Sequence, residues 1–335
     1  MDFTKGYTAS FYATFVDPSS WYDIGRFEIV SGTIERTCSD LRQSANLTIR
    51  EWEYDTDCWI RIYMDTDQNG DRTHTPIFTG IATSPSSNFN NGVTDINLQC
   101  YSILKPAEDI LLKRGWYALK GSDGASLIKD LLSVTHAPVY IEGDSPSLLS
   151  SIIAEDDETN LSMIELILAS INWSLRIDGI GNIILSEFSN EPISYFSPDT
   201  SDVIETSFSK TNDWFGCPNV LLVTSGEDTY TYKDENPDSR FSIPNRGREV
   251  WEIDNDVTIS NNESMEAYAK RKLNELQEQT EKVQYARRFL PDIYPDDLVR
   301  INYPELQGDY FIESQSINLG AAAKTNESVF RYLDI

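Results

Sequence analysis

Histidine and cysteine, the side chains that most often supply nucleophiles, general bases and metal ligands, are few and scattered in this sequence. The two histidines are His74 and His136, so a histidine triad, a multi-histidine metal site or an HExxH motif has almost nothing to build on. The cysteines are far apart and form no CxxC pair: Cys38, Cys58, Cys100 and Cys217. We expect the histidines at turns and on the surface, and the cysteines to be reduced, mostly buried thiols.

Carboxylates are abundant, and adjacent pairs such as Asp156–Asp157 and Asp296–Asp297 contain the two groups that a glycosidase uses as acid and base. In a chain with 54 acidic residues such pairs arise by chance, and nothing distinguishes one candidate from another. We therefore predict no catalytic residues and no enzymatic activity.

The acidic segment Asp65–Asp71 resembles the opening of an EF-hand calcium loop, whose first, third, fifth and sixth positions it matches. The twelfth position is Pro76 instead of the bidentate glutamate, and strand patterns flank the segment. A hairpin turn at Asn69-Gly70 is the favoured interpretation. The weak candidates for cation binding are Asp65, Asp67, Asn69 and Asp71, and we predict no dedicated metal site.

Nucleotide and nucleic-acid binding are disfavoured by both motif and charge. The glycines of Asp178–Gly181 join two strand patterns, so no helix N-terminus follows them to hold a phosphate. The chain has 27 basic and 54 acidic residues, a formal net charge of −27, and such a surface repels phosphates. A helical face explains the basic cluster Lys270–Lys272. We expect no cofactor and no stable nucleic-acid binding.

The first residues show no basic segment followed by an apolar core, and no run of about 18 apolar residues occurs. These features predict a protein made in a cytoplasm, with neither Sec export nor membrane insertion.

Residues 1–105 show strand periodicity. Apolar and polar residues alternate over Phe11–Phe15, Ala45–Ile49 and Ile60–Met64, and turn signals separate the runs. The pattern predicts an antiparallel β-barrel or sandwich for this first domain.

Residues 106–190 change to helical periodicity. A Ser-Asp cap at residues 122–123 precedes one apolar stripe, and Thr159-Asn160 begins a second helix with Leu161, Ile164, Leu168 and Ile171 on one face. Alternation over Trp173–Ile177 and a tight glycine turn then predict a strand hairpin. We interpret this segment as a small α+β domain.

Residues 191–335 return to strand patterns, near 219–225, 248–253, 283–289, 297–303 and 310–319. A polar stretch at about 226–245 predicts a long hairpin or loop, and an apolar stripe with a capping box at Ser260 and Glu263 predicts a helix at about 261–280. The fold class is therefore mainly β with an α+β insert, as two similar antiparallel β-barrel domains flanking a small α+β domain.

Seven tryptophans and 17 tyrosines suggest either a sugar-binding platform or apolar packing. Most of them alternate with polar residues on expected strands, which favours core packing or subunit contact. Trp116 and Tyr117 fall in a connecting segment and are the candidates for an exposed interface.

Several short motifs occur in one order along nearly the whole chain: Ile34–Leu41, Ser44–Ile49, Ile77–Ile81, Leu98–Pro106, Ile152–Phe188, Pro291–Val299 and Gly308–Leu319. In this order and spacing the sequence resembles the baseplate central hub proteins of contractile phage tails and phage tail-like particles, such as tailocins and defective prophages.

The resemblance implies two tail-tube-like β domains per subunit and a homotrimeric ring that adapts the sixfold tail tube to a threefold spike, leaving a channel for DNA or other passage. It implies tail tube, central spike and other baseplate proteins as partners. The expected location is the baseplate of a virion or tail-like particle, made in the bacterial cytoplasm and used in host cell entry. The acidic charge is expected either on the inner wall of the ring or as a solubilising surface.

Two alternatives stay open. A tail-tip protein of a flexible-tailed phage, or the hub of another contractile injection system, would share the β domains. A carbohydrate-binding or carbohydrate-cleaving module is a more distant alternative, suggested by the aromatic and acidic residues.

Overall fold

The computed structural model describes residues 2–3, 5–52, 54, 56–90, 93–148, 150–189, 191–198, 204–212, 214–225, 228–255, 264–277 and 280–332. The chain divides into two compact units. Unit 1 comprises residues 1–208 and 284–329, and unit 2 comprises residues 209–283 and 330–335.

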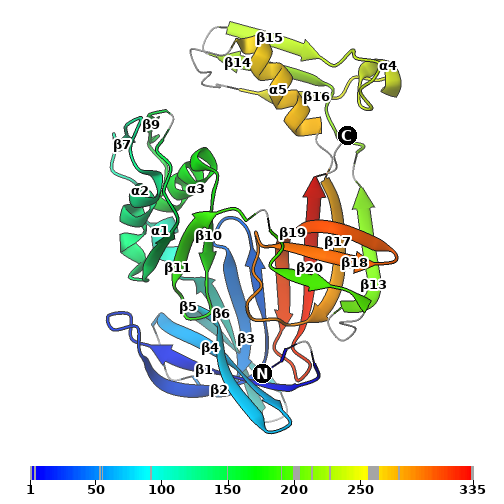
Figure 1. Ribbon diagram of the computed structural model, residues 1–335. Coiled ribbons are helices and arrows are strands. Elements are labelled where there is room, and N and C mark those ends of the chain that lie inside the picture. Colours follow the sequence, from blue (N-terminus) through cyan, green and yellow to red (C-terminus); the bar gives the residue numbers. More distant parts are fainter. Residues whose placement is uncertain are drawn as a thin grey trace. The chain divides into compact units, whose positions relative to one another are not determined.

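Unit 1 begins with an antiparallel β-barrel (Figure 1). Its strands are β1 (Thr8–Val16), β2 (Asp23–Thr37), β3 (Gln43–Ile49), β4 (Cys58–Gln68), β5 (Asp71–Asn90) and β6 (Val93–Ser102). Among the described residues these six strands pair in the order β1-β4-β5-β6-β3-β2, and β2 pairs again with β1, which closes the barrel. The antiparallel β structure predicted for the first part of the chain is confirmed, in its barrel form.

The alternation of residue types determines which side chains fill the barrel. Ala13, Leu47, Ile62, Phe78 and Leu98 are each at most 2% exposed. Beside Leu47 and Leu98 the polar neighbours Asn46, Asn97 and Gln99 are exposed, as strand alternation requires. Burying one large apolar side chain contributes about 1.5–3 kcal/mol, so this core stabilises the barrel strongly. The predicted hairpin is also confirmed, because Asn69 and Gly70 both have positive φ between β4 and β5.

A second β domain is formed later in the chain by strands most of whose residues belong to unit 1 (Figure 1). Its strands are β12 (Ser194–Phe196), β13 (Ile204–Asn212), β17 (Thr280–Arg288), β18 (Leu298–Tyr303), β19 (Leu306–Asn318) and β20 (Lys324–Tyr332). The strand order is β12-β18-β19-β20-β17-β13. Its core contains a fully buried ion pair between Arg287 and Glu327, 2.7 Å apart, with Tyr285 and Gln315 donating further hydrogen bonds to Glu327.

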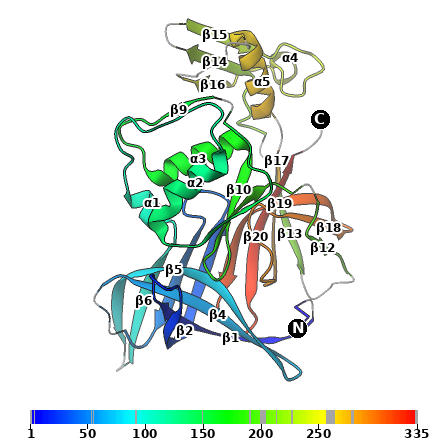
Figure 2. The same cartoon turned by 60° about the vertical axis from the view of Figure 1, so that its left-hand side comes forward.

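The two β domains share one sheet, because β2 pairs with β19. The first half of β2 bonds to β1, and its second half bonds to β19 from Thr33 to Thr37. Ile317 and Leu319 from the second domain pack into the core of the first barrel. Figure 2 shows the strands of both domains running through this junction.

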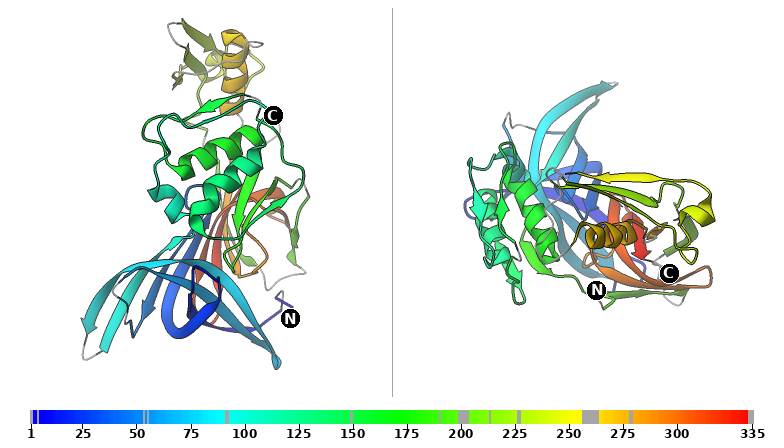
Figure 3. Two further views of the ribbon diagram at one scale, coloured as in Figure 1. Left: turned by 90° about the vertical axis from the view of Figure 1, so that its left-hand side faces the viewer. Right: turned by 90° about the horizontal axis from the view of Figure 1, so that it is seen from above.

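The α+β domain lies between the two β domains in sequence. It contains α1 (Lys105–Asp109), β7 (Tyr117–Ala118), α2 (Gly124–Leu131), the 3₁₀ helix η1 (Leu132–Thr135), β8 (Val139–Glu142), β9 (Ile152–Ile153), α3 (Asn160–Ile171), β10 (Trp173–Ile177) and β11 (Ile183–Glu187). Both predicted helix starts are confirmed, since Asp123 accepts from the Ser126 amide and Thr159 forms a capping box with Ser162. Figure 3 shows the helices packed together beside this small sheet.

The tight turn between β10 and β11 holds the α+β domain on the first barrel. A Cβ on Gly179 would lie 1.9 Å from the Pro76 carbonyl oxygen, so only glycine allows this approach. Thr79 donates to the Gly179 carbonyl at 2.8 Å, and Arg61 and Trp21 donate to the Ile180 carbonyl at 2.9 and 3.0 Å.

Unit 2 is a small α/β structure with β14 (Val220–Ser225), β15 (Asp228–Lys233), α4 (Ile243–Arg246), β16 (Trp251–Asp254) and α5 (Met265–Gln277). The sheet order is β15-β14-β16, and α5 packs on Leu221 and Val223. The strands expected near 219–225 and 248–253 thus form a separate sheet and are not part of the second β domain.

The polar stretch 226–245 was expected to be a long hairpin or a loop, and the antiparallel pairing of β14 with β15 confirms the hairpin. It contains β15 and α4, because Tyr230 and Tyr232 alternate with threonines and pack toward α5. The helix expected at about 261–280 spans Met265–Gln277, and the predicted cap residues Ser260 and Glu263 lie outside the described residues.

Candidate functional site

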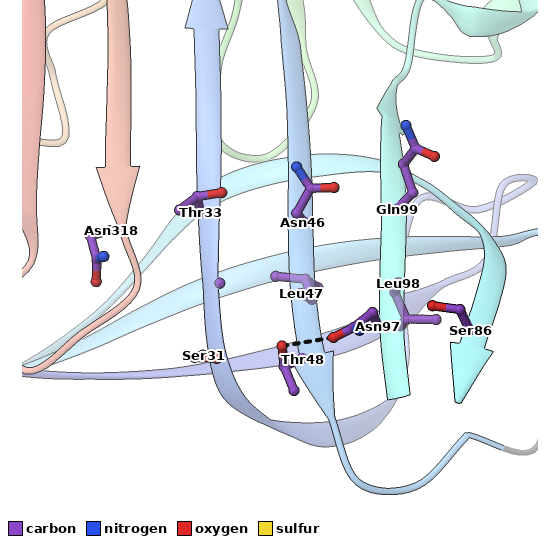
Figure 4. A pocket seen from close by; sticks show the side chains of 11 residues that line it. Ser31, Thr33, Asn46, Leu47, Thr48, Ser86, Asn97, Leu98, Gln99 and Asn318 are labelled. Carbon is purple, nitrogen blue, oxygen red and sulfur yellow. Dashed lines mark hydrogen bonds between the residues drawn. The ribbon is translucent and has the colours of Figure 1, made fainter. Parts of the chain in front are cut away.

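The outer face of the shared sheet is lined by uncharged polar side chains. Gln99, Asn46, Thr33 and Asn318 occupy directly paired positions on the neighbouring strands β6, β3, β2 and β19. A second row of paired positions contains Ser86, Asn97, Thr48 and Ser31, on β5, β6, β3 and β2. Figure 4 shows both rows side by side. We call these eight residues the neutral sheet face.

The neutral sheet face borders an open depression of about 580 Å³. Its floor includes Leu47, Leu98 and Gly32, and the Thr48 hydroxyl donates to the Asn97 amide oxygen at 3.0 Å (Figure 4). Gly32 lies at a close approach, since a Cβ there would be 2.6 Å from the Asn46 carbonyl oxygen. A side chain at position 32 would push β2 and β3 apart, so the depression depends on the glycine at this position.

The electrostatics of this face differ from those of the chain as a whole. None of the residues that line the depression is ionisable, although the chain carries a formal net charge of −27. The next row along the strands contains Glu35, which accepts a hydrogen bond from Ser316 at 2.7 Å. Amides and hydroxyls exchange hydrogen bonds with water or a passing polar chain, but they form no ion pair with phosphate.

The predicted weak cation ligands lie at the β4–β5 hairpin, where other groups engage them. Asp65 lies 2.7 Å from the Nδ1 atom of His74. Asp67 accepts a hydrogen bond from the Gly70 amide and contacts Arg72 at 2.9 Å, and both contacts lower the pKa of its carboxyl. Asn69 and Asp71 complete the turn between the strands. In the described part of the chain no group of three His, Cys, Asp or Glu is placed to hold a metal ion.

The two carboxylate pairs considered as catalytic have different surroundings. Asp156 is exposed and contacts Arg114 at 3.2 Å. Asp296 is engaged by Arg42 at 3.4 Å and by the Ser174 hydroxyl at 2.8 Å. Burial raises the pKa of Asp297 to about 6. Asp296 therefore links Arg42, after β2, to Ser174 of the α+β domain. We interpret this carboxylate as a structural contact within unit 1.

The histidines and cysteines lie apart from one another. His136 is exposed at the end of η1 with a φ of 59°, and His74 is an exposed strand residue. Cys100 is buried, and burial raises its pKa to about 12, whereas Cys38, Cys58 and Cys217 are only half-buried. The expectation of mostly buried thiols was thus wrong for three of the four, because these three lie near strand ends or in connecting segments.

The structure separates the two interface candidates. Trp116 packs partly against the core of the α+β domain. Tyr117 is 62% exposed and lies opposite Ile153, which is 74% exposed, in the β7–β9 pairing. Leu119, two residues after Tyr117, is 60% exposed. We call Tyr117, Leu119 and Ile153 the apolar edge of the α+β domain.

Sequence reasoning missed the neutral sheet face because β2 and β19 come from opposite ends of the chain. The alternation Ser31-Gly-Thr33, Asn46-Leu-Thr48 and Asn97-Leu-Gln99 is visible in the sequence, but the pairing that aligns these residues is not. Among the described helices none is long and apolar enough to cross a membrane.

At the level of sequence, no protein-family model and no curated protein matches the chain. Solved structures do match. The tail protein of Neisseria meningitidis is 14% identical, with a TM-score of 0.66 over 98% of this chain and 97% of that chain. The 43 kDa tail protein of prophage MuSo2 from Shewanella oneidensis is 11% identical, with a TM-score of 0.65 over 95% and 97%.

A third match is the prophage tail protein gp18 of Listeria monocytogenes, which is 10% identical with a TM-score of 0.55 over 96% of this chain and 94% of that chain. The likeness in each case spans nearly the whole length of both chains. The chain therefore has the fold of phage tail proteins, as its resemblance to baseplate hub proteins predicted.

Proposed function

We propose that this chain is a structural subunit of a phage tail or tail-like particle, and that it acts as the central hub of the baseplate. The observation that carries the proposal is the β2–β19 pairing, which builds two β domains into one sheet within a fold shared with phage tail proteins. Three copies of such a chain present six β domains, so a trimer matches a sixfold tube on one side and a threefold spike on the other.

The neutral sheet face supplies the wall of the proposed channel. A wall of lysine and arginine would bind DNA through phosphate contacts and counterion release, and hydroxyls and amides avoid this. The sequence left two places open for the acidic charge, the inner wall of the ring and a solubilising surface, and the two rows contain no acidic residue. We therefore assign the acidic charge mainly to solubility before assembly.

The apolar edge of the α+β domain supplies a contact with neighbouring tail or baseplate proteins. Tyr117, Leu119 and Ile153 are each at least 60% exposed, and an exposed apolar group of this kind is typical of an interaction site. The partners in this proposal are the tail tube protein, the spike protein and other baseplate proteins. The location is the tail tip of the particle, and the role is structural, with no catalysis.

Location and oligomeric mass test the proposal together. Labelling an epitope-tagged chain in purified particles with gold-conjugated antibody is expected to mark the tail tip, and native mass measurement of the isolated baseplate is expected to give three copies. Label along the tail shaft, or a monomeric soluble enzyme that turns over glycans, would contradict the proposal. A tag at the tip of a flexible tail would support the tail-tip alternative instead.

A further inference from the structure

Three arginines from different parts of unit 1 line one small cavity. Arg36 and Arg42 come from the first barrel and the turn after β2, and Arg176 comes from β10 of the α+β domain. Tyr294, from the segment before β18, completes the lining. The cavity has a volume of about 20 Å³, which accommodates one water-sized particle.

Each of these arginines has a buried Nε–H group without a hydrogen-bond partner in the described part of the chain. Arg36 is 2% exposed and Arg42 is 7% exposed. Buried donors are almost always satisfied in native proteins, so unpartnered donors on three residues that line one cavity point to a bound acceptor. A water molecule has two lone pairs and satisfies two donors, whereas a halide ion accepts from all three.

The charge around the cavity also favours an anion over water. Arg42 is neutralised by Glu165, with both carboxylate oxygens at 3.0 Å, and by Asp296 at 3.4 Å. Arg176 lies 3.9 Å from Asp297. Arg36 forms no ion pair with any described carboxylate: its guanidinium donates to the Ile77 carbonyl at 2.6 Å and to the Gln315 amide oxygen at 3.5 Å.

Arg36 is therefore a buried cation held by neutral groups. The Tyr294 ring lies 4.6 Å from its guanidinium carbon, and the Phe289 ring lies 5.6 Å away. Burial lowers the pKa of Arg36, and Tyr294, Asp178 and Asp297 only partly oppose this effect. Removing a guanidinium from water without a counterion is unfavourable, and an anion in the cavity would offset that cost.

We propose that this cavity is a structural binding site for a single monovalent halide, chloride under physiological conditions, held by the Nε–H groups of Arg36, Arg42 and Arg176. The ion would tie the first barrel, the α+β domain and the segment before β18 together within unit 1. It plays no part in catalysis and is independent of the proposed hub role.

Thermal unfolding of the full chain tests the site. Sodium chloride replaces sodium gluconate at constant ionic strength, so that general screening is unchanged. Chloride at ten times its dissociation constant raises the ratio of folded to unfolded protein about elevenfold. This corresponds to a saturable rise of about 3 °C or more in Tm. The Arg176→Lys variant keeps the positive charge beside Asp297 but lacks Nε–H, and its chloride titration midpoint is expected to move at least tenfold higher.

Arg300→Lys is the matched control, because Arg300 pairs with Asp309 on the surface and is expected to leave the chloride response unchanged. Crystals of the wild-type chain grown in sodium bromide provide a second readout that needs no variant. The expected result is an anomalous peak bounded by Arg36, Arg42 and Arg176. Ordered water without an anomalous peak at this position, or equal Tm values in chloride and gluconate, would overturn the proposal.

Discussion

Thr33 on β2 and Asn318 on β19 occupy directly opposed positions in an antiparallel pairing between strands from opposite ends of the chain. This pairing joins two β domains into one sheet and continues a row of amides and hydroxyls from one domain to the other. Backbone hydrogen bonds between β2 and β19 therefore fix the position of one β domain relative to the other. A mobile linker would not fix it.

Gly32 allows the strands beneath the neutral sheet face to approach closely. Replacing it with alanine places a Cβ 2.6 Å from the Asn46 carbonyl oxygen and 2.9 Å from Leu47, so β2 and β3 must shift. We expect Gly32→Ala to lower the free energy of unfolding by about 1–3 kcal/mol, as overpacking does. Chemical denaturation measures the change. Gly6→Ala, at a position with open space, is the control, and an equal loss in both variants would contradict this explanation.

The ion pair between Arg287 and Glu327 fixes the core of the second β domain. Both side chains are fully buried, so Glu327→Gln leaves the Arg287 charge without a counterion. We expect a loss of about 3–5 kcal/mol in the free energy of unfolding. Asp309→Asn, which removes a surface partner of Arg300, is expected to cost at most about 1 kcal/mol. Similar denaturation midpoints for the two variants would show that the buried pair is not a main stabilising contact.

Asp297 makes the stability of unit 1 depend on pH in a definite direction. Burial raises the pKa of its carboxyl to about 6, so between pH 4 and pH 6 the folded state holds a proton that the unfolded state has lost. The stabilisation from this group is present at the acidic end and is lost as the pH rises through 6. It amounts to at most about 3 kcal/mol.

Asp297→Asn tests this dependence, since the amide does not titrate. The free energy of unfolding of the wild type minus that of Asp297→Asn is expected to fall from pH 4 to pH 7. Asp309 has the opposite sign, because Arg300 lowers the pKa of its carboxyl below the ordinary value of 3.8, so the corresponding difference for Asp309→Asn rises with pH mainly below pH 4 and does not fall between pH 4 and pH 7. A pH-independent difference for Asp297→Asn would contradict the assignment.

The apolar edge of the α+β domain is expected to act in assembly and not in folding. Tyr117→Ser with Ile153→Ser removes two exposed apolar side chains from one face of the β7–β9 pair. We expect an unchanged Tm within about 2 °C and a clear loss of assembled particles, measured by sedimentation. Tyr22→Ser, which removes a tyrosine that is 74% exposed elsewhere, is the control. Normal assembly of the double variant would remove this surface from the proposed interfaces.

Local patterns predicted the parts of this fold that local interactions determine. The first barrel, the capped helices at Asp123 and Thr159, and the Asn69-Gly70 hairpin follow from periodicity and turn chemistry. The separate sheet of unit 2 was missed because its strand β15 is short and lies between polar segments. The neutral sheet face and the arginine cavity were also missed, since each depends on contacts between residues far apart in sequence.

We propose that three copies of this chain form a ring at the tail axis. A cryo-EM reconstruction of the intact particle measures the copy number and the position of the chain in one experiment. We expect three copies around the axis at the baseplate, with the row of Gln99, Asn46, Thr33 and Asn318 facing the channel. One or six copies at the axis, a position away from it, or a channel wall formed by charged side chains of this chain would rule out this hub role.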